Sequence, residues 1–346
     1  MSKINLISKD PHFKKTSIYE SFHKRPLGFI DGGASGNIHP LVMPVASVTH
    51  CICFEPDGQM YEALCQSYDK DNPFAKINIF DVALGRGAGY RSLYVTKDEV
   101  NTSLLVPSRE LLARYLMRGF KLQKKARVKT ESLDAIVSRN MNKRERWGEF
   151  IKLDCQGMEY DILLGAEETL NKNCVALYLE LEFFQMYKNQ RTFSEIDLFL
   201  RKKGFQLYGF YPSYISAKKL NRRKYDSEER IVWADALYFK DPFSIGGVGS
   251  RFCRRDIEVL VLAAILTGYY DFALEIVERY YKNARNDAVR IKRIILSLAG
   301  MRKKTIEDDL AEFMHEIRGN HKNRYLLAKK FIDRHKSNNS IDFITI

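Results

Sequence analysis

The feature that most constrains this chain is a glycine-rich turn that directly follows a short apolar run. Together they read Gly-Phe-Ile-Asp-Gly-Gly-Ala-Ser-Gly-Asn over residues 28–37. Glycine has no Cβ atom, so the backbone can turn tightly at such a site and approach a ligand closely. A strand that ends in Asp31 and breaks at once into glycines is typical of the first βα unit of a nucleoside-binding α/β sheet.

Two later apolar runs also end in an acidic residue. The run over residues 48–54 is followed by Glu55, and the run that begins at Lys152 ends at Asp154. The carboxyl ends of parallel strands meet in one crevice of an open α/β sheet, so we expect Asp31, Glu55 and Asp154 to converge there. A carboxylate after the second strand is well placed to accept hydrogen bonds from ribose hydroxyls. The spacing predicts a nucleoside-type cofactor and leaves its identity open.

Strand patterns and helix patterns alternate along most of the chain. Strands are expected at residues 27–31, 49–54, 75–83, 92–96, 126–131, 150–154, 175–181, 205–211 and 231–239. Helices are expected at residues 58–68, 109–118, 132–137, 157–170 and 193–203. This alternation predicts a doubly wound, mostly parallel α/β sheet of the Rossmann-like type.

A glycine-rich segment at residues 246–250 is the clearest linker signal, and only helical patterns follow it. These helices are expected at residues 254–266, 270–281, 286–298, 306–317 and 323–334. We therefore expect three parts, which are a lead-in over residues 1–27, a Rossmann-like domain over 28–243 and a C-terminal all-α domain over 250–346. The helical domain is expected to pack on the first domain or to join two copies of the chain as a homo-oligomer.

Charge and composition restrict the partners and the compartment. The formal net charge is +13, with basic segments at residues 109–146, at 201–230 and in the C-terminal third. Each segment could serve an anionic partner, and an ordinary solvated surface is an equal alternative. The six cysteines lack the spacing of a zinc site and suit reduced, buried thiols. Because no signal peptide is evident and the longest apolar run, residues 259–266, is too short to span a bilayer, a cytoplasmic location is expected.

Seven short motifs occur in an order that carries a resemblance. They are Asp-Gly-Gly-Ala-Ser-Gly at 31–36, Phe-Glu-Pro-Asp at 54–57, Val-Ala-Leu-Gly at 82–85, Thr-Ser-Leu-Leu at 102–105, Ser-Leu-Asp at 132–134, Ile-Lys-Leu-Asp-Cys-Gln-Gly-Met-Glu at 151–159 and Leu-Leu-Gly-Ala at 163–166. With these motifs the chain resembles the FkbM family of methyltransferases from about Gly28 to Lys240. The resemblance implies a class I fold and methyl transfer to hydroxyls of sugars and natural products.

The resemblance also implies S-adenosyl-L-methionine as the cofactor. The residues carried over to its site are Asp31, Gly32, Gly33, Ala34, Ser35, Gly36, Glu55, Pro56, Ala83, Leu84 and Asp154. In such a site Glu55 accepts from the ribose and Asp154 faces the methionine amino group and the acceptor. The segment formed by Ala83 and Leu84 lines the adenine.

Removing the proton from a sugar hydroxyl calls for a general base. The candidate catalytic residues are Asp154 and Glu180, which are expected at strand ends beside the crevice; a purely structural hydrogen-bonding role is the alternative for each. The family pattern usually has glycine at Asn37 and often glutamate at Gln156, so Gln156 is not expected to act as a base. His39 is expected to begin a helix, although it would be the next residue to test.

Three residues are expected to contact the acceptor, namely Ser103, Glu182 and Tyr187. Ser103 belongs to the fourth motif, and Glu182 shares a strand face with Glu180 through the two-residue period of a strand. Tyr187 lies in an aromatic segment that resembles the acceptor-side loop of the family. No metal site is expected, because nothing in the spacing of the acidic residues demands one.

The function favoured by these patterns is an O-methyltransferase that acts on a sugar or glycoconjugate hydroxyl. The acceptor is expected to be a small molecule or a glycan, with an anionic nucleotide-sugar or lipid-linked acceptor suggested by the charge. The alternatives are a nicotinamide-dependent oxidoreductase, an RNA methyltransferase and a binding module with a vestigial cofactor site. Nucleic acid is not the expected partner, because no RNA-recognition signature is present.

Overall fold

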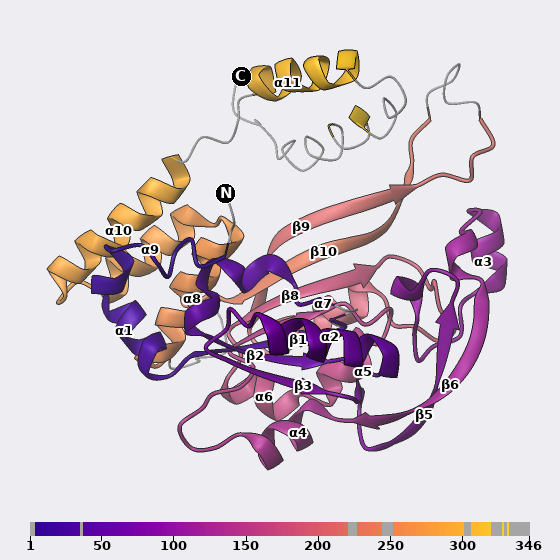
Figure 1. Cartoon of the computed structure of the whole chain (residues 1–346), viewed down its shortest axis with the longest axis horizontal. Helices are drawn as coiled ribbons and strands as arrows, with labels where there is room; N and C mark the ends of the chain where they lie inside the picture. Colours follow the sequence, from indigo (N-terminus) through magenta and orange to yellow (C-terminus); the bar gives the residue numbers. More distant parts are fainter. Residues whose placement is uncertain are drawn as a thin grey trace. The chain divides into compact units, whose positions relative to one another are not determined.

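The chain divides into two compact units, residues 1–295 and residues 296–346. Figure 1 gives the course of the chain in a computed structural model. The structure describes residues 4–34, 37–220, 227–243, 252–300 and 306–319, together with residues 327, 328 and 331. The predicted linker at 246–250 and most of the helix predicted at 323–334 lie outside the described residues.

Among the described residues, seven strands form the central sheet, in the order β3-β2-β1-β7-β8-β10-β9. Their bounds are β1 Leu27–Gly32, β2 Thr49–Phe54, β3 Lys76–Phe80, β7 Phe150–Leu153, β8 Ala176–Glu182, β9 Phe205–Ile215 and β10 Arg230–Lys240. Strand β1 pairs in parallel with β2 and β7, β2 with β3, and β7 with β8, whereas β10 runs antiparallel to both β8 and β9. The predicted Rossmann-like, mostly parallel sheet is therefore confirmed.

The central strands are apolar because helices and other segments cover both of their faces. Every residue of β1, β2 and β7 is buried, as expected for parallel strands inside an α/β sheet. The helices that connect the strands are α2 Gly58–Lys70, α3 Arg109–Arg114, α4 Leu133–Asn140, α5 Glu159–Leu164, α6 Glu167–Lys172 and α7 Phe193–Lys202. Helix α2 begins after Asp57, whose carboxylate accepts from the backbone N–H groups of Gln59 and Met60.

A small second sheet lies beside the strand ends. Its described strands run in the order β4-β6-β5, with bounds β4 Ala83–Leu84, β5 Gly89–Thr96 and β6 Leu122–Glu131. Strands β5 and β6 form a long antiparallel ribbon, which is seen at the right of Figure 1. The strand predicted at 75–83 is therefore two strands, β3 and β4, which belong to different sheets.

The helix predicted over residues 157–170 is wrong as one element, because it is two short helices, α5 and α6. Asp134 of α4 accepts from the backbone N–H groups of Glu168 and Thr169, at 2.8 Å each, and so caps a new helix start. A Cβ atom at Gly165 would lie 2.3 Å from the carbonyl oxygen of Gly85. The break thus allows close approach of two backbone segments.

The N-terminal segment and the first C-terminal helices belong to the same unit as the sheet. The helices concerned are α1 Ser17–Lys24, α8 Arg254–Thr267, α9 Tyr270–Tyr280 and the part of α10 (Arg285–Gly300) that ends at Ile295. The unit boundary therefore falls after residue 295 rather than near residue 250, where the sequence pattern changes. Helix α11, Ile306–Gly319, belongs to the second unit.

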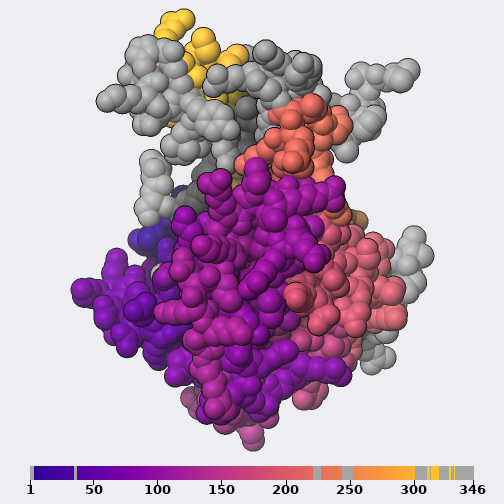
Figure 2. All heavy atoms as spheres, turned by 90° about the vertical axis from the view of Figure 1, so that its right-hand side faces the viewer, coloured from indigo at the N-terminus to yellow at the C-terminus, as the bar shows by residue number. Residues whose placement is uncertain are grey.

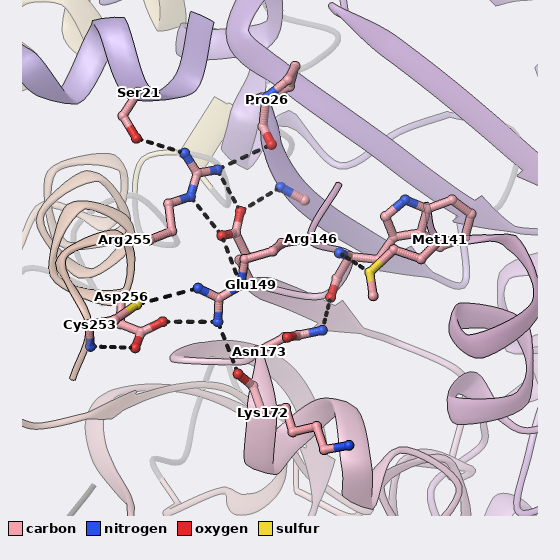
Figure 3. Close-up of polar contacts among 12 residues, drawn as sticks. Ser21, Pro26, Met141, Arg146, Glu149, Lys172, Asn173, Cys253, Arg255 and Asp256 are labelled. Atoms are coloured by element: carbon pink, nitrogen blue, oxygen red, sulfur yellow. Dashed lines mark hydrogen bonds and ion pairs between the residues drawn. The ribbon is translucent and has the colours of Figure 1, made fainter. Parts of the chain in front are cut away.

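Helix α8 is held against the sheet by a buried ion pair (Figure 3). The Arg255 guanidinium donates to both carboxylate oxygens of Glu149, at 2.7 and 2.8 Å, and Glu149 directly precedes β7. The same guanidinium donates to the Pro26 carbonyl and to the Ser21 hydroxyl, at 3.2 Å each. Because α8 is buried along most of its length, its apolar sequence reflects packing inside the unit. No helix within the described ranges is long and apolar enough to cross a membrane.

Candidate active site

A cavity of about 360 Å³ lies at the carboxyl ends of β1, β2, β7 and β8, beside the small sheet. Its lining combines an apolar wall with acidic and amide side chains. The lining residues are Gly33, Phe54, Glu55, Pro56, Asp57, Met60, Val82, Ala83, Leu84, Leu93, Val95, Glu99, Val100, Asn101, Thr102, Ser103, Leu104, Asp154, Cys155, Gln156, Met158, Glu180 and Trp233. The cavity thus brings together eight of the predicted site residues, which are Gly33, Glu55, Pro56, Ala83, Leu84, Ser103, Asp154 and Glu180.

The glycine turn after β1 borders the cavity because Gly33 lets two backbone segments touch. Gly33 has a φ of +83°, and a Cβ atom there would lie 2.0 Å from the Asp154 carbonyl oxygen. No other residue fits this position without moving the end of β7. The predicted site residues Gly32 and Ala34 do not line the cavity, and Ser35 and Gly36 lie outside the described residues.

Asp31 stabilises the glycine turn through contacts with protein groups and does not line the cavity. Its carboxylate is completely buried, lies 3.1 Å from the Lys152 ammonium and accepts from the His39 backbone N–H at 2.7 Å. Asp31 was predicted to contact the cofactor. In the structure its carboxylate instead bonds to protein groups and does not line the cavity. His39 also lies outside the cavity lining, and its Nδ1 atom accepts from the Leu41 backbone N–H at the start of a 3₁₀ segment.

Lys152 is a site residue that the sequence reading missed. Its ammonium lies 3.1 Å from Asp31 Oδ1 and 3.8 Å from Asp154 Oδ2, and it donates to the Gly33 carbonyl at 3.1 Å. Burial opposes the charge, but the carboxylates of Asp31 and Asp154 outweigh it and hold the pKa of Lys152 above its ordinary value. The only signal in the sequence was a lysine inside an apolar strand.

The β2 end of the cavity carries Glu55. The residue is buried, and its Oε1 atom accepts from the backbone N–H of Asp57 at 2.9 Å, which orients the carboxylate. Apolar side chains from the small sheet, Leu84, Leu93 and Val95, form the adjoining wall. This end of the cavity therefore suits a ligand with both an apolar face and hydroxyl groups.

The β7 and β8 end carries two carboxylates that share one amide. The Gln156 Nε2 atom donates to Asp154 Oδ1 and to Glu180 Oε2, at 3.0 Å each. The Gln156 Oε1 atom accepts from the Tyr187 hydroxyl at 2.8 Å, and the Gln156 carbonyl accepts from the Ser103 hydroxyl at 2.7 Å. These contacts fix the amide orientation, so Gln156 acts as a neutral bridge between the two acids.

Two residues predicted to contact the acceptor lie behind this bridge. Tyr187 is buried in an apolar cluster with Phe120, Met186 and Val232, and its hydroxyl contacts the cavity lining through Gln156 and the Asn101 carbonyl. Glu182 is also buried and does not line the cavity. The prediction failed because an aromatic segment after a strand packs inward as readily as it faces a ligand.

Three acids near the bridge, Glu159, Glu180 and Glu182, have raised pKa values. Burial, followed by the neighbouring Asp154 carboxylate, raises the pKa of Glu180 well above its ordinary value. Burial raises the pKa of Glu159 to about 7, and burial with the Glu159 carboxylate nearby raises the pKa of Glu182 well above its ordinary value. Such shifts at a cavity are typical of groups that exchange protons.

Trp233 of β10 also lines the cavity and was not singled out from the sequence. Strand β10 pairs with β8, and in this pairing Trp233 lies directly opposite Glu182. The sequence pattern around Trp233 predicts only a strand, so it did not indicate that this side chain would line a cavity. Together with Glu180 it gives this end of the cavity an aromatic side chain beside an acid.

Residues 44–207 match the family described as methyltransferase FkbM domain. The match begins after the glycine turn and includes Glu55, Asp154 and Glu180. Methyltransferases of this family use S-adenosylmethionine. No curated protein matches the chain.

Solved methyltransferase structures are similar at low identity. The methyltransferase FkbM of Methylobacillus flagellatus is 14% identical over 62% of this chain and 43% of that chain, with a TM-score of 0.36, so the chain spans less than half the length of that protein. TrmK of M. capricolum with S-adenosylhomocysteine is 9% identical over 80% of this chain and 96% of that chain, with a TM-score of 0.32. Magnesium protoporphyrin IX methyltransferase of Synechocystis with bound SAM is 8% identical over 64% of each chain, with a TM-score of 0.30. Residues 44–207, just under half of the chain, thus match an FkbM methyltransferase domain.

Proposed function

We propose that the cavity binds S-adenosylmethionine and that the enzyme transfers the methyl group to a hydroxyl of a sugar or glycoconjugate. The observation that carries this proposal is the pair Asp154 and Glu180, joined through Gln156, in the same cavity as Glu55. Strands β1 and β7 lie between β2 and β8 in the sheet. The distance from β2 to β8 is therefore three strand spacings, or about 14 Å. The acids therefore occupy opposite ends of a cavity long enough for an extended nucleoside.

The residues present fit this cofactor. A volume of about 360 Å³ is in the range of small-molecule sites, and its wall is apolar where an adenine would lie. Glu55 would accept from the ribose hydroxyls, and Ala83 with Leu84 would contact the adenine. Asp154 would face the ammonium of the methionine part, beside the Gly33 backbone. When bound, S-adenosylmethionine supplies a methyl group on a positively charged sulfur, which these carboxylates complement.

The acceptor hydroxyl loses a proton as its oxygen bonds to the methyl carbon, and the electrons of the broken carbon–sulfur bond remain on sulfur. A carboxylate held beside the hydroxyl takes that proton. Because Glu180 has a raised pKa, its carboxylate is a stronger base than an ordinary glutamate once it is ionised. Asp154 is the second candidate for this role. Gln156 holds both side chains without adding a third negative charge.

Trp233 supports the assignment of a sugar acceptor. An aromatic ring beside a hydrogen-bonding carboxylate is a common arrangement for orienting a ring-shaped ligand that has polar edges. We therefore assign Trp233 as the surface on which the acceptor ring packs. Ser103 is assigned an indirect role, because its hydroxyl holds the Gln156 backbone.

The proposal is tested in two steps with the full chain. Calorimetric titration with S-adenosylmethionine, with NAD as the comparison, should give binding of the first only. Incubation with methyl-labelled S-adenosylmethionine and a panel of saccharides should then give an O-methylated sugar by mass spectrometry. Binding of NAD alone, or methylation of nitrogen or carbon atoms alone, would contradict the proposal.

A further inference from the structure

The outer face of the β5–β6 ribbon carries tyrosines and cations in alternation. In an antiparallel pair, directly opposite residues share one face. The pairs on this face are Tyr90 with Lys129, Ser92 with Arg127, and Tyr94 with Lys125. These six residues are called the ribbon strip. Figure 2 faces the side of the molecule on which the ribbon lies.

The other face of the ribbon belongs to the cavity. Leu93 and Val95 of β5 are buried and line the cavity wall. Successive residues of a strand alternate between faces, so the ribbon strip points away from that wall. Tyr90 has 64% of its surface exposed, which is unusual for a large aromatic side chain held in a regular strand. The strip is therefore an open surface directly behind the cofactor site.

Two cations of the strip are available to an anionic partner. The Arg127 guanidinium lies 4.7 Å from the centre of the Tyr90 ring, and the Lys125 ammonium lies 5.2 Å from the centre of the Tyr94 ring. Within the described part of the chain, neither cation has a carboxylate within 4.0 Å, whereas Lys129 pairs with Glu131 at 2.5 Å. Lys125 and Arg127 are two residues apart, or about 6.7 Å along the strand. The strip thus offers two rings, each with one cation beside it.

The strip is connected to the rim of the cavity through one residue. The Tyr94 backbone N–H donates to the Ser103 carbonyl at 2.8 Å. Ser103 lines the cavity, and its hydroxyl donates to the carbonyl of Gln156, the residue that bridges the two acids. The strand that carries the strip is therefore bonded directly to a segment that lines the cavity.

We propose that the ribbon strip docks an anionic glycan, so that the acceptor hydroxyl belongs to a longer saccharide that carries phosphate, sulfate or carboxylate groups. This inference rests on the proposed function, which supplies the saccharide hydroxyl. Tyr90 and Tyr94 are about 13 Å apart along the strand, so each ring meets a separate sugar. They are too far apart to hold neighbouring bases in one stack, which favours a glycan over RNA. The cations neutralise the acidic groups, in agreement with the net charge of +13.

The test measures binding of heparin, as an anionic glycan probe, to the full chain. The variant is the double charge reversal Lys125→Glu with Arg127→Glu. The matched control is Lys124→Glu, which changes charge on the same strand but pairs with Val95 on the inner face. Neutral dextran and poly(U) are titrated in parallel. Calorimetry with S-adenosylmethionine is run on every variant, to separate loss of glycan binding from loss of the fold or of the cofactor site.

Wild type should bind heparin with an affinity that falls as salt rises, and dextran should not bind. The double variant should bind heparin roughly tenfold more weakly or worse, because two attractive pairs become repulsive, while Lys124→Glu changes affinity less than about twofold. Equal losses in both variants, or no loss in either, would overturn the assignment. Tighter binding of poly(U) through the same two cations would replace the glycan with nucleic acid. If S-adenosylmethionine fails to bind wild type, the proposed function fails, whatever the heparin result.

Discussion

The acids at the two ends of strand β7 have different kinds of hydrogen-bond partner. Glu149, just before the strand, is fully buried and paired with Arg255 through two hydrogen bonds (Figure 3). Asp154, just after the strand, lies beside Glu180, and their common hydrogen-bond donor is the neutral amide of Gln156. In the described part of the chain, no cation lies within 4.0 Å of Glu180.

This difference in partners separates an acid with a structural role from acids that we propose take part in catalysis. A buried acid that is matched by a bidentate cation holds two elements together. Glu180, by contrast, is buried beside the Asp154 carboxylate, and these two effects raise its pKa well above the ordinary value. One short strand therefore joins a structural ion pair to the site that we propose for methyl transfer.

The largest expected effect at the structural end follows from Arg255→Met. This change leaves the Glu149 carboxylate buried without its main cation, so we expect a loss of about 3–5 kcal/mol in the free energy of unfolding. Urea denaturation of the full chain measures the loss. The control is Lys172→Met, which removes a cation of the exposed pair with Glu168 and should change stability by less than about 1 kcal/mol. A loss below about 1 kcal/mol for Arg255→Met would show that the ion pair does not hold α8.

A smaller effect is expected from pH at the reactive end. The pKa of Glu159 rises from 4.5 unfolded to about 7 folded, so its stabilising contribution is complete below pH 4.5 and is lost as pH rises to about 7. A shift of this size corresponds to at most about 3 kcal/mol. Wild type should therefore lose stability relative to Glu159→Gln between pH 5 and pH 8, measured by urea denaturation at each pH. Parallel stabilities across that range would refute the raised pKa.

The smallest effect is expected for Glu55→Ala. Removing the carboxylate should weaken S-adenosylmethionine binding by about 1–3 kcal/mol, since charge-assisted hydrogen bonds to the ribose are lost. Calorimetric titration gives the dissociation constant, and Glu62→Ala serves as the control, because Glu62 is exposed on α2 and does not line the cavity. An unchanged dissociation constant in folded Glu55→Ala protein would remove this residue from the cofactor site.

Much of the architecture was readable from local pattern. Apolar runs that end in Glu55 and Asp154 predicted both the strands and the end of the sheet where the cavity lies, because strand direction alone brings those ends together. The capped start of α4 was equally local, since Ser132 accepts from the Ala135 backbone N–H. Elements of this kind depend on residues that are close in sequence.

The missed features depend on pairing between distant segments. Lys152 reaches Asp31 because the register of β7 against β1 puts these residues side by side, and neither strand encodes that register on its own. The bridge made by Gln156 needs a left-handed backbone, with a φ of +54°, that places its amide between two strand ends. The helices after the glycine-rich segment read as a separate domain, because nothing local reveals that Arg255 pairs with Glu149.

The central claim is that Asp154 and Glu180 serve proton transfer rather than structure. The decisive measurement is the dissociation constant for S-adenosylmethionine together with the methyl-transfer rate at saturating cofactor, for Asp154→Asn beside Glu180→Gln. The variant that lacks the base should lose roughly two to four orders of magnitude in rate while its cofactor affinity changes far less. If Asp154 instead holds the methionine ammonium, Asp154→Asn should bind the cofactor weakly and keep most of its saturated rate, and Glu180→Gln should lose the rate. Near-normal saturated rates in both variants would contradict the account and direct the search for the base to His39.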